Sequence, residues 1–373
     1  MKNHLKANRQ MMMTRHIFGI LGLLSLIPFS FAQKSIETVE GNRIKTKKLN
    51  QQIEFLMDSI GIPGVSMAII NDKEIVYHET FGVQNIDTKE AISKGNIFEG
   101  ASLSKPIFAY FAMKMVDKGI LELDKPLYEY FPHPAIDSTS QEAYKKITAR
   151  MALSHSTGFP NHSLGKRISL PFEPGTDFLY SGEAYQYLAA IIGILNGVGW
   201  KDKFNAIFEQ EVTQPLGMTH TSFLWDNYLA THKVYGHKKG QPTDNSLGGW
   251  SGKTFNAFSS IHSEAYEYAL FIQAMLKKEG LNEESFEQML APENVFKEDN
   301  KLRQETGQTA WGLGFAQKPS PNGLMHLHTG NNHDFQAYCM FIMEKGYGIV
   351  LFTNSDQLLP LVQGLNHTIG QQF

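Results

Sequence analysis

Cysteine is almost absent from this sequence. Its 373 residues include one cysteine, Cys339, so no disulfide can form within the chain. A lone thiol can be a nucleophile, but reactive thiols lie beside a basic group or a helix N-terminus that stabilises the thiolate. The segment around Cys339, residues 335–341, has instead the apolar and aromatic composition of a buried strand. We therefore expect Cys339 to be a core residue.

Signatures of metal and phosphate binding are also missing from the sequence. The 14 histidines form no H-E-x-x-H pair, and His155 and His162 have no partners that would complete a zinc site. No glycine-rich phosphate loop is present either. The sequence therefore predicts no metal ion and no cofactor.

The N-terminal segment, residues 1–32, has no acidic residue and is typical of a secretory signal. Four basic residues are followed by an apolar run over 17–27 and by a small-x-small pattern that ends at Ala32. The alternative is an uncleaved membrane anchor, but the run is shorter than the ~20 residues that span a bilayer. We expect cleavage after Ala32, no stable membrane span afterwards, and an exported protein that is periplasmic or secreted.

Positive charge is scarce in the rest of the chain. The whole sequence has 34 Lys and Arg against 37 Asp and Glu, a net charge of −3. Removing the four basic residues of the N-terminal segment leaves 30 against 37, a net charge of −7. Nucleic acids bind basic faces, so the excess of negative charge argues against such a partner. A small molecule or a peptide is the expected substrate.

Apolar periodicity predicts one folded domain at 47–373, preceded by a polar linker at 33–46. Expected helices are 49–60, 102–118, 262–278 and 356–368, and expected strands are 64–70, 74–81, 324–328, 335–344 and 348–353. Because strands lie near both ends of the domain with helices between them, we expect an α/β fold of the α+β kind. Its sheet would come from about 47–100 and 324–373, and a helical region from about 120–320.

The first candidate for chemistry is the pair Ser102 and Lys105 at the start of an expected helix. Three residues of spacing bring both side chains to one helix face. A serine hydroxyl needs a neighbouring base to become a good nucleophile, and a partly buried lysine with a lowered pKa can be that base. The alternative is a helix cap followed by a surface lysine.

The second candidate is Tyr180, followed by Ser181, Gly182 and Glu183. A tyrosine beside the Ser102–Lys105 pair could be a general base and acid, with its pKa lowered by the lysine charge. The alternative is an ordinary packing tyrosine.

The third candidate is the run His328, Thr329, Gly330 and Asn331 at the end of an expected strand. A strand that lines the nucleophile can offer a backbone N–H to a developing oxyanion and a polar side chain to a substrate carboxylate. Taken alone, a turn that contains a histidine has no such meaning.

In this order, the three elements resemble the active-site motifs of the penicillin-recognising serine hydrolases, above all the class C β-lactamases, DD-peptidases and related esterases. Further stretches that match this family, again in order, are 62–66, 121–126, 153–158, 215–218 and 311–315. The resemblance runs from about 50 to 355. It implies a β-lactamase/transpeptidase-like fold with a mainly antiparallel sheet flanked by helices, an all-helical region, and the site between them.

The resemblance also implies the role of each residue. Ser102 would be acylated, and Lys105 and Tyr180 would handle the proton. The oxyanion hole would be formed by the backbone N–H groups of Ser102 and Asn331. Thr329 would face a substrate carboxylate, and water would then deacylate the enzyme.

Three departures from the family pattern bear on the substrate. Gly182 occupies a position where the family usually has asparagine, whose amide would bond the acyl side of the substrate; such a bond contributes ~1–3 kcal/mol to discrimination. Glu183 is either a substitute for that amide or a solvated helix-cap residue. His328 replaces a lysine and so removes a permanent cation. Asp334 stands where a glycine is common and would narrow or polarise the rim.

The sequence therefore predicts an exported serine hydrolase that acts through an acyl-enzyme on an ester, amide or peptide. The alternatives are a β-lactamase or DD-carboxypeptidase proper, and a non-catalytic module that binds penicillin or peptidoglycan fragments. The departures at Gly182 and His328 weaken the case for efficient lactam hydrolysis. The sequence leaves the oligomeric state open.

Overall fold

The computed structural model describes residues 35–199, 202–243 and 254–371. The signal predicted at 1–32 lies outside this part of the chain. Within the described residues, no helix is long and apolar enough to cross a membrane.

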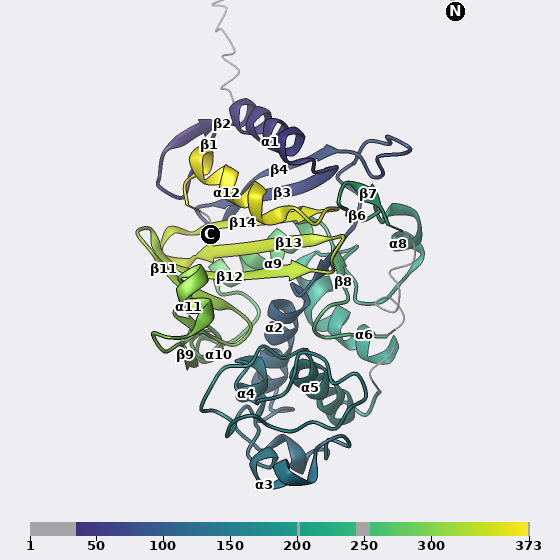
Figure 1. Ribbon diagram of the computed structural model, residues 1–373, viewed down its shortest axis with the longest axis vertical. Helices are drawn as coiled ribbons and strands as arrows, with labels where there is room; N and C mark the ends of the chain where they lie inside the picture. Colours follow the sequence, from purple (N-terminus) through teal and green to yellow (C-terminus); the bar gives the residue numbers. More distant parts are fainter. Residues whose placement is uncertain (1–34, 200–201, 244–253, 372–373) are drawn as a thin grey trace, which may run out of the picture. The chain divides into compact units, whose positions relative to one another are not determined.

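The centre of the fold is an eight-stranded sheet in which every neighbouring pair is antiparallel (Figure 1). The strand order is β4-β3-β14-β13-β12-β11-β10-β9. The strands are β3 (Gly64–Asn71), β4 (Glu74–Gly82), β9 (Asn294–Val295), β10 (Ala310–Trp311), β11 (Ala316–Ser320), β12 (Gly323–Asn331), β13 (Gln336–Ile342) and β14 (Tyr347–Thr353). The sheet thus joins the two ends of the domain, as the sequence predicts.

Side chains alternate along the strands, and each face of the sheet packs against its own hydrophobic core. In β13, Tyr338 and Met340 belong to the core on one face, whereas Cys339 and Phe341 belong to the core on the other. Cys339 is free and buried, as predicted. Burial raises the pKa of its thiol to about 12, which is unlike a reactive cysteine.

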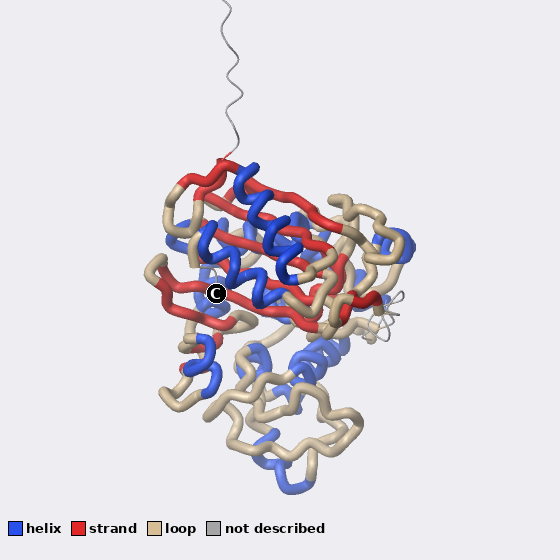
Figure 2. The backbone as a smooth tube through the Cα atoms, turned by 45° about the horizontal axis from the view of Figure 1, so that its top comes forward, coloured by secondary structure: helices blue, strands red, loops and turns tan. Residues whose placement is uncertain are grey.

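Helices α1 (Thr46–Ile60) and α12 (Leu358–Ile369) cover one face of the sheet (Figure 2). Leu49, Ile53 and Met57 recur every four residues in α1 and are its buried positions. The helix ends at Gly61, which adopts the left-handed conformation (φ 82°) that glycine takes without strain. Both helices confirm the predicted helical segments.

The segment predicted as a linker, 33–46, instead contains a two-stranded hairpin. Strands β1 (Ser35–Glu37) and β2 (Arg43–Lys45) pair with each other, and Ile36, Val39 and Ile44 are buried. The Val39 N–H also donates to the carbonyl of Ile369 at the end of α12. The prediction was wrong because three isolated apolar residues among polar ones give too short an alternation to be recognised as strands.

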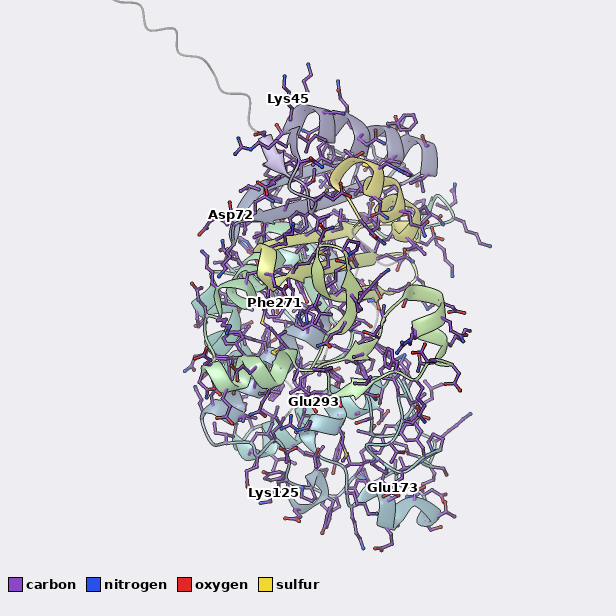
Figure 3. All side chains as sticks on the ribbon, turned by 90° about the vertical axis from the view of Figure 1, so that its left-hand side faces the viewer. Lys45, Asp72, Lys125, Glu173, Phe271 and Glu293 are labelled. Carbon is purple, nitrogen blue, oxygen red and sulfur yellow. The ribbon has the colours of Figure 1, made fainter. Side chains whose placement is uncertain are left out.

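Helices α2 (Ser104–Asp117) and α9 (Ala265–Lys277) pack against the opposite face of the sheet. Phe271 of α9 is fully buried among these elements (Figure 3). The helical region then extends this core; its members are α3 (Gln141–Tyr144), α4 (Ala149–Leu153), α5 (Gly182–Leu195), α6 (Asp202–Phe208), α7 (Gln214–Leu216), α8 (Asn227–His232), α10 (Glu283–Leu290) and α11 (Lys301–Thr306). Short 3₁₀ helices occur at Leu127–Glu129, Ser138–Ser140 and Met343–Lys345, and a π-helical turn at Glu209–Thr213.

The predicted helical region, about 120–320, is not purely helical. Strands β9, β10 and β11 extend the main sheet from within it, and β8 (Ile261–Ser263) pairs with β5 (Phe98–Ala101) in a separate two-stranded sheet. Strands β6 (His237–Lys238) and β7 (Gln241–Pro242) form another small pair. Strands of two to five residues carry too little alternation for a sequence to reveal them.

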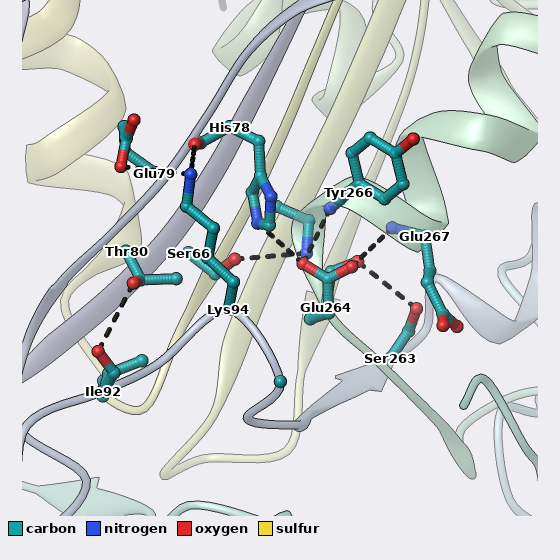
Figure 4. Close-up of polar contacts among 12 residues, drawn as sticks. Ser66, His78, Glu79, Thr80, Ile92, Lys94, Ser263, Glu264, Tyr266 and Glu267 are labelled. Atoms are coloured by element: carbon teal, nitrogen blue, oxygen red, sulfur yellow. Dashed lines mark hydrogen bonds and ion pairs between the residues drawn. The ribbon is translucent and has the colours of Figure 1, made fainter. Parts of the chain in front are cut away.

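The start of α9 is held by side-chain hydrogen bonds (Figure 4). The Glu264 carboxylate accepts from the N–H groups of Tyr266 and Glu267, at 2.8 and 2.6 Å, and forms an ion pair with His78 of β4 at 2.9 Å. The hydroxyl of Ser66 in β3 accepts from the Ala265 N–H. The exposed first N–H groups of α9 are thus satisfied, and the helix is fixed to two strands of the sheet.

Candidate active site

Ser102 lies in a tight turn between β5 and α2. Ala101 before it has φ +48°, a left-handed conformation that costs a non-glycine residue ~1–2 kcal/mol. The turn is closed by a hydrogen bond from the Leu103 N–H to the Gly100 carbonyl. The Ser104 hydroxyl donates to the Ala101 carbonyl and accepts from the Ile261 N–H of β8. These contacts fix the Ser102 backbone and leave its side chain partly exposed.

Lys105 lies on the same side of this turn and is completely buried. Its Nζ donates to Ser102 Oγ at 3.1 Å and to the Phe258 carbonyl at 2.9 Å. Burial lowers the pKa of Lys105 well below its ordinary value, because an apolar environment disfavours the charged form. The spacing argument from sequence is confirmed in its geometry: the two side chains meet within hydrogen-bonding distance. A neutral lysine in this position can accept the Ser102 proton.

Tyr180, from the segment before α5, completes the cluster. Lys105 Nζ lies 4.6 Å from the centre of the Tyr180 ring. Burial raises the pKa of Tyr180, and a hydrogen bond between the Tyr180 and Ser102 side chains offsets only part of the rise. The expectation of a lowered pKa is therefore wrong. A desolvated lysine that is largely neutral supplies little positive charge to stabilise a phenolate.

Three further side chains surround the Tyr180 ring. The His155 ring centre lies 4.3 Å from it, that of Trp311 5.8 Å, and that of His328 6.2 Å. His155 accepts from the Ser181 N–H through Nδ1, which holds the segment that carries Tyr180. Three buried nitrogens have no hydrogen-bond partner within the described part of the chain: His155 Nε2, His328 Nε2 and Trp311 Nε1. Buried nitrogens without partners are costly and are found where a site needs polar groups in place.

His328 and Thr329 lie near the end of β12. Burial is the main cause that lowers the pKa of His328 to about 3, so its ring is neutral at physiological pH. The side chain of Thr329 is exposed. Strand β11 pairs with β12 only as far as Leu327, so the last residues of β12 extend past β11. On the side of β11, the last residues of β12 therefore lie beyond the ladder, which is compatible with the expected strand beside the nucleophile.

Gly330 and Asn331 approach the nucleophile turn closely. A side chain at Gly330 would place its Cβ 2.2 Å from the Gly100 carbonyl oxygen, so only glycine fits here. Asn331 is exposed, and its side-chain oxygen accepts from the His333 N–H. The structure thus brings the end of β12 against β5 just before Ser102.

Gly182 and Glu183 do not replace the missing asparagine. A Cβ at Gly182 would lie 2.7 Å from both the Asn161 carbonyl oxygen and the Phe258 ring, so this space is already filled. The Glu183 carboxylate accepts from the Ser163 N–H and lies 3.6 Å from His133. The hydrogen bond to His133 is the main reason that the pKa of Glu183 is lowered. Glu183 therefore holds the loop that begins at Asn161.

Asp334 lies in the turn between β12 and β13 and is only 5% exposed. Its carboxylate accepts from the Thr243 hydroxyl and packs against Gly236. The expectation that Asp334 narrows or polarises the rim is therefore wrong. At the position where the family commonly has glycine, the Asp334 side chain instead binds Thr243 of a neighbouring segment.

Sequence reasoning missed two contributors to the site. The Phe258 carbonyl binds Lys105, but a backbone acceptor leaves no trace in residue type. The sequence shows of His155 only that it lacks partners for a zinc site, yet it packs against Tyr180, and its Nε2 has no hydrogen-bond partner among the described residues. Its place in the 153–158 stretch, which matches the family pattern, was the available signal.

The antiparallel sheet, the helical region and the serine–lysine–tyrosine cluster together define a β-lactamase-like fold with a candidate nucleophile. The model of the Beta-lactamase family matches residues 49–372, and the chain belongs to this family.

Solved structures share this fold at low sequence identity. The octameric penicillin-binding protein homologue from Pyrococcus abyssi has a TM-score of 0.72 and 21% identity, and covers 87% of this chain and 76% of its own. The D-alanine carboxypeptidase AmpC from Burkholderia cenocepacia has a TM-score of 0.69 and 20% identity, and covers 86% and 98%. These likenesses confirm the predicted β-lactamase/transpeptidase-like fold.

Two relatives are similar in sequence. Protein flp of Staphylococcus aureus is 24% identical over 345 residues, which cover 87% of this chain and 66% of flp. The chain therefore spans slightly less than two thirds of the length of this relative. A beta-lactamase of Pseudomonas fluorescens is 24% identical over 339 residues and is covered over 93% of its length.

A first prediction concerns Gly182. Restoring the asparagine of the family pattern by Gly182→Asn should destabilise the fold by ~1–3 kcal/mol, because Phe258 and Asn161 already fill the space. It should give no gain in lactam hydrolysis. Urea unfolding and turnover of nitrocefin measure the two effects.

The matched control is Gly197→Asn at the other end of α5. Gly197 has φ +68° and nothing within 4 Å of its Cβ position, and asparagine tolerates this conformation. The control should cost less than ~1 kcal/mol. Equal stability of the two variants, or a gain of lactam turnover in Gly182→Asn alone, would contradict the assignment.

Proposed function

We propose that this protein is an exported hydrolase that forms an acyl-enzyme at Ser102 and acts on an ester, amide or peptide. One observation carries the proposal: a completely buried lysine with a lowered pKa lies 3.1 Å from a partly exposed serine hydroxyl. Burying an amine costs free energy, so a completely buried lysine indicates a function. The function that the geometry offers here is to accept the proton of Ser102.

In the proposed mechanism, the Ser102 hydroxyl transfers its proton to neutral Lys105 while Oγ bonds to the carbonyl carbon of the substrate. The carbonyl oxygen becomes negative and is stabilised by the backbone N–H groups of Ser102 and Asn331. The proton held by Lys105 passes to the leaving group, with the Tyr180 hydroxyl as the neighbouring donor. Water then attacks the acyl carbon and gives a proton to Lys105. The bond between this carbon and Oγ breaks, the acid product leaves, and the proton on Lys105 returns to Ser102 Oγ.

The surroundings of the site argue against efficient hydrolysis of lactams and favour other substrates. His328 is neutral near pH 7, so it offers no permanent cation to a substrate carboxylate, and Thr329 contributes a neutral hydroxyl. The position of the asparagine that would bond an acyl-side amide is occupied by Gly182, which has no donor side chain. We therefore propose neutral esters, amides or peptides as the substrate class.

Loss of the nucleophile tests this proposal. A fluorophosphonate probe should label the wild type at Ser102, and Ser102→Ala should lose the label and several orders of magnitude in kcat/KM, because the covalent route is gone. Short-chain p-nitrophenyl esters, nitrocefin and a D-Ala-D-Ala peptide are compared as substrates, with multiple turnovers expected on the esters.

The outcomes separate the two candidate functions. Covalent labelling of Ser102 without turnover on any substrate would favour the non-catalytic binding module, for which the missing asparagine at Gly182 is the argument. A wild type that is not labelled at Ser102 would refute both.

The lowered pKa of Lys105 predicts the pH dependence. The neutral, active amine is present above the lowered pKa and is lost as the pH falls through it, so kcat/KM should fall about tenfold per pH unit on the acid side. Activity should therefore reach its plateau well below the pH at which an ordinary lysine loses its proton. A profile that keeps rising to about pH 10.4, where an ordinary lysine loses its proton, would contradict the mechanism.

Export is a separate part of the proposal and rests on residues 1–32, which lie outside the described residues. Protein recovered from the periplasm or medium should begin at Gln33, because the small-x-small pattern ends at Ala32. Edman sequencing of this fraction checks the cleavage site. An intact chain beginning at Met1 and confined to the cytoplasm would contradict export.

A further inference from the structure

Glu99 is a buried acidic residue in β5, three residues before Ser102. It is 3% exposed, and each of its carboxylate oxygens has a donor from another segment. Lys233 Nζ lies 3.1 Å from Oε1, and Asn332 Nδ2 donates to Oε2 at 2.7 Å. Burial acts to raise the pKa of Glu99, but the charges of Lys233 and His262 and the bond from Asn332 outweigh it and lower the pKa. Glu99 is therefore ionised.

The hydrogen bond between Glu99 and Asn332 joins two segments that share no strand ladder. Strand β5 pairs with β8 in its own small sheet, whereas β12 belongs to the main sheet. Asn332 follows the last residue of β12 directly. A shared ladder of backbone hydrogen bonds therefore does not set the distance between the two segments, which depends on packing and on side-chain contacts.

These two segments carry the two halves of the proposed oxyanion hole. The Ser102 N–H follows β5, and the Asn331 N–H lies at the end of β12. Between them, Gly330 packs against Gly100 without room for a side chain. The Glu99–Asn332 bond lies beside this contact, because Glu99 is one residue before Gly100 and Asn332 is two residues after Gly330. It is thus placed to hold the two N–H groups at a fixed separation.

Lys233 attaches the same carboxylate to a third point. Its Nζ also lies 4.6 Å from the centre of the Phe335 ring, at the far end of the turn that follows β12. Its backbone is fixed next to β5, because the Ile97 N–H donates to the His232 carbonyl and the Val234 N–H to the Ile97 carbonyl. The ion pair therefore spans from β5 to this turn.

A buried ion pair is weak evidence of stability, because desolvation offsets much of the attraction. An apolar pair would fill the same volume at lower cost. It would not accept the hydrogen bond from Asn332, and this bond is the specific product of a carboxylate at this position.

We propose that Glu99 is a positioning residue that, through Asn332, sets the separation of the Ser102 and Asn331 N–H groups. This inference rests on the proposed function, since it concerns the geometry of the oxyanion hole. Displacing one N–H group by a fraction of an ångström weakens its bond to the transition state more than any bond to the bound substrate.

Asn332→Ala is the test, because it removes the bond and leaves the Glu99–Lys233 pair intact. We expect kcat/KM on a p-nitrophenyl ester to fall about 10- to 100-fold, less than the loss from removing an oxyanion donor outright. The affinity for phenylboronic acid should fall by a similar factor. Its boron accepts the Ser102 Oγ lone pair as the serine proton passes to Lys105, and the adduct resembles the tetrahedral intermediate.

The matched control is Asn205→Ala in α6. Asn205 also donates from Nδ2 to a glutamate, Glu209, at 2.6 Å, but within the helical region. This variant should match the wild type in kcat/KM and in boronate affinity. A merely structural role of Asn332 would lower the melting temperature and leave boronate affinity unchanged.

Two double variants separate the hydrogen bond from the charge without leaving an unpaired buried charge. Glu99→Gln with Lys233→Met keeps an acceptor for Asn332, so activity should stay within about threefold of the wild type. Glu99→Met with Lys233→Met removes the acceptor and should lose as much as Asn332→Ala.

The outcomes distinguish this inference from the proposed function. If the wild type is labelled at Ser102 but Asn332→Ala retains kcat/KM and boronate affinity within twofold, the positioning role is wrong and the hydrolase stands. If the wild type is not labelled at Ser102, the proposed function itself fails.

Discussion

The site depends on the complete burial of the Lys105 side chain. A lysine in an apolar interior cannot keep its charge without a carboxylate partner, so burial itself produces the neutral amine. The side chains that bury it come from different parts of the chain: the rings of Tyr180, Tyr185 and Phe258 lie 4.6, 5.9 and 5.4 Å from Nζ. The burial of Lys105 therefore requires that α5 and the segment before β8 pack against the start of α2. The chemistry of the serine is a consequence of the assembled core rather than of a local motif.

This dependence explains which parts could be predicted from the sequence. The Ser102–Lys105 contact is local, because two side chains three positions apart at a helix start lie on the same face. The long strands and helices can be predicted from their apolar periodicity. The direction of the Tyr180 pKa could not be predicted, because it depends on whether the lysine beside it is charged, and burial decides that. Glu183 and Asp334 were misread for the same reason: their partners, Ser163 and Thr243, are unrelated to them in sequence. The hairpin at 35–45 was missed because its alternation is too short.

Both halves of the site lack a full charge, and this constrains the substrate. On the serine side, burial of Lys105 keeps a base that is neutral. On the strand side, burial keeps His328 neutral as well, with a pKa of about 3. Neither group offers a full positive charge to an anionic substrate. On the proposed function, recognition on this side would rest on shape and on neutral hydrogen bonds, for which the exposed Thr329 hydroxyl is a candidate. Neutral hydrogen bonds contribute less than charge-assisted ones, which favours substrates whose binding does not depend on a carboxylate.

The strained turn before Ser102 fits the same arrangement. Ala101 holds a left-handed φ, and Gly100 touches Gly330, so the nucleophile is fixed at a point where two separate sheets meet. Strain of this kind persists only where the surroundings over-determine the backbone. Here the Ser104 hydroxyl ties the turn to β8, and Glu99 ties it to the end of β12. An oxyanion hole shared between two sheets can be stabilising only if its donors are already in place before the reaction begins. The cost in backbone strain and in a buried ion pair is therefore best understood as the cost of that fixed geometry.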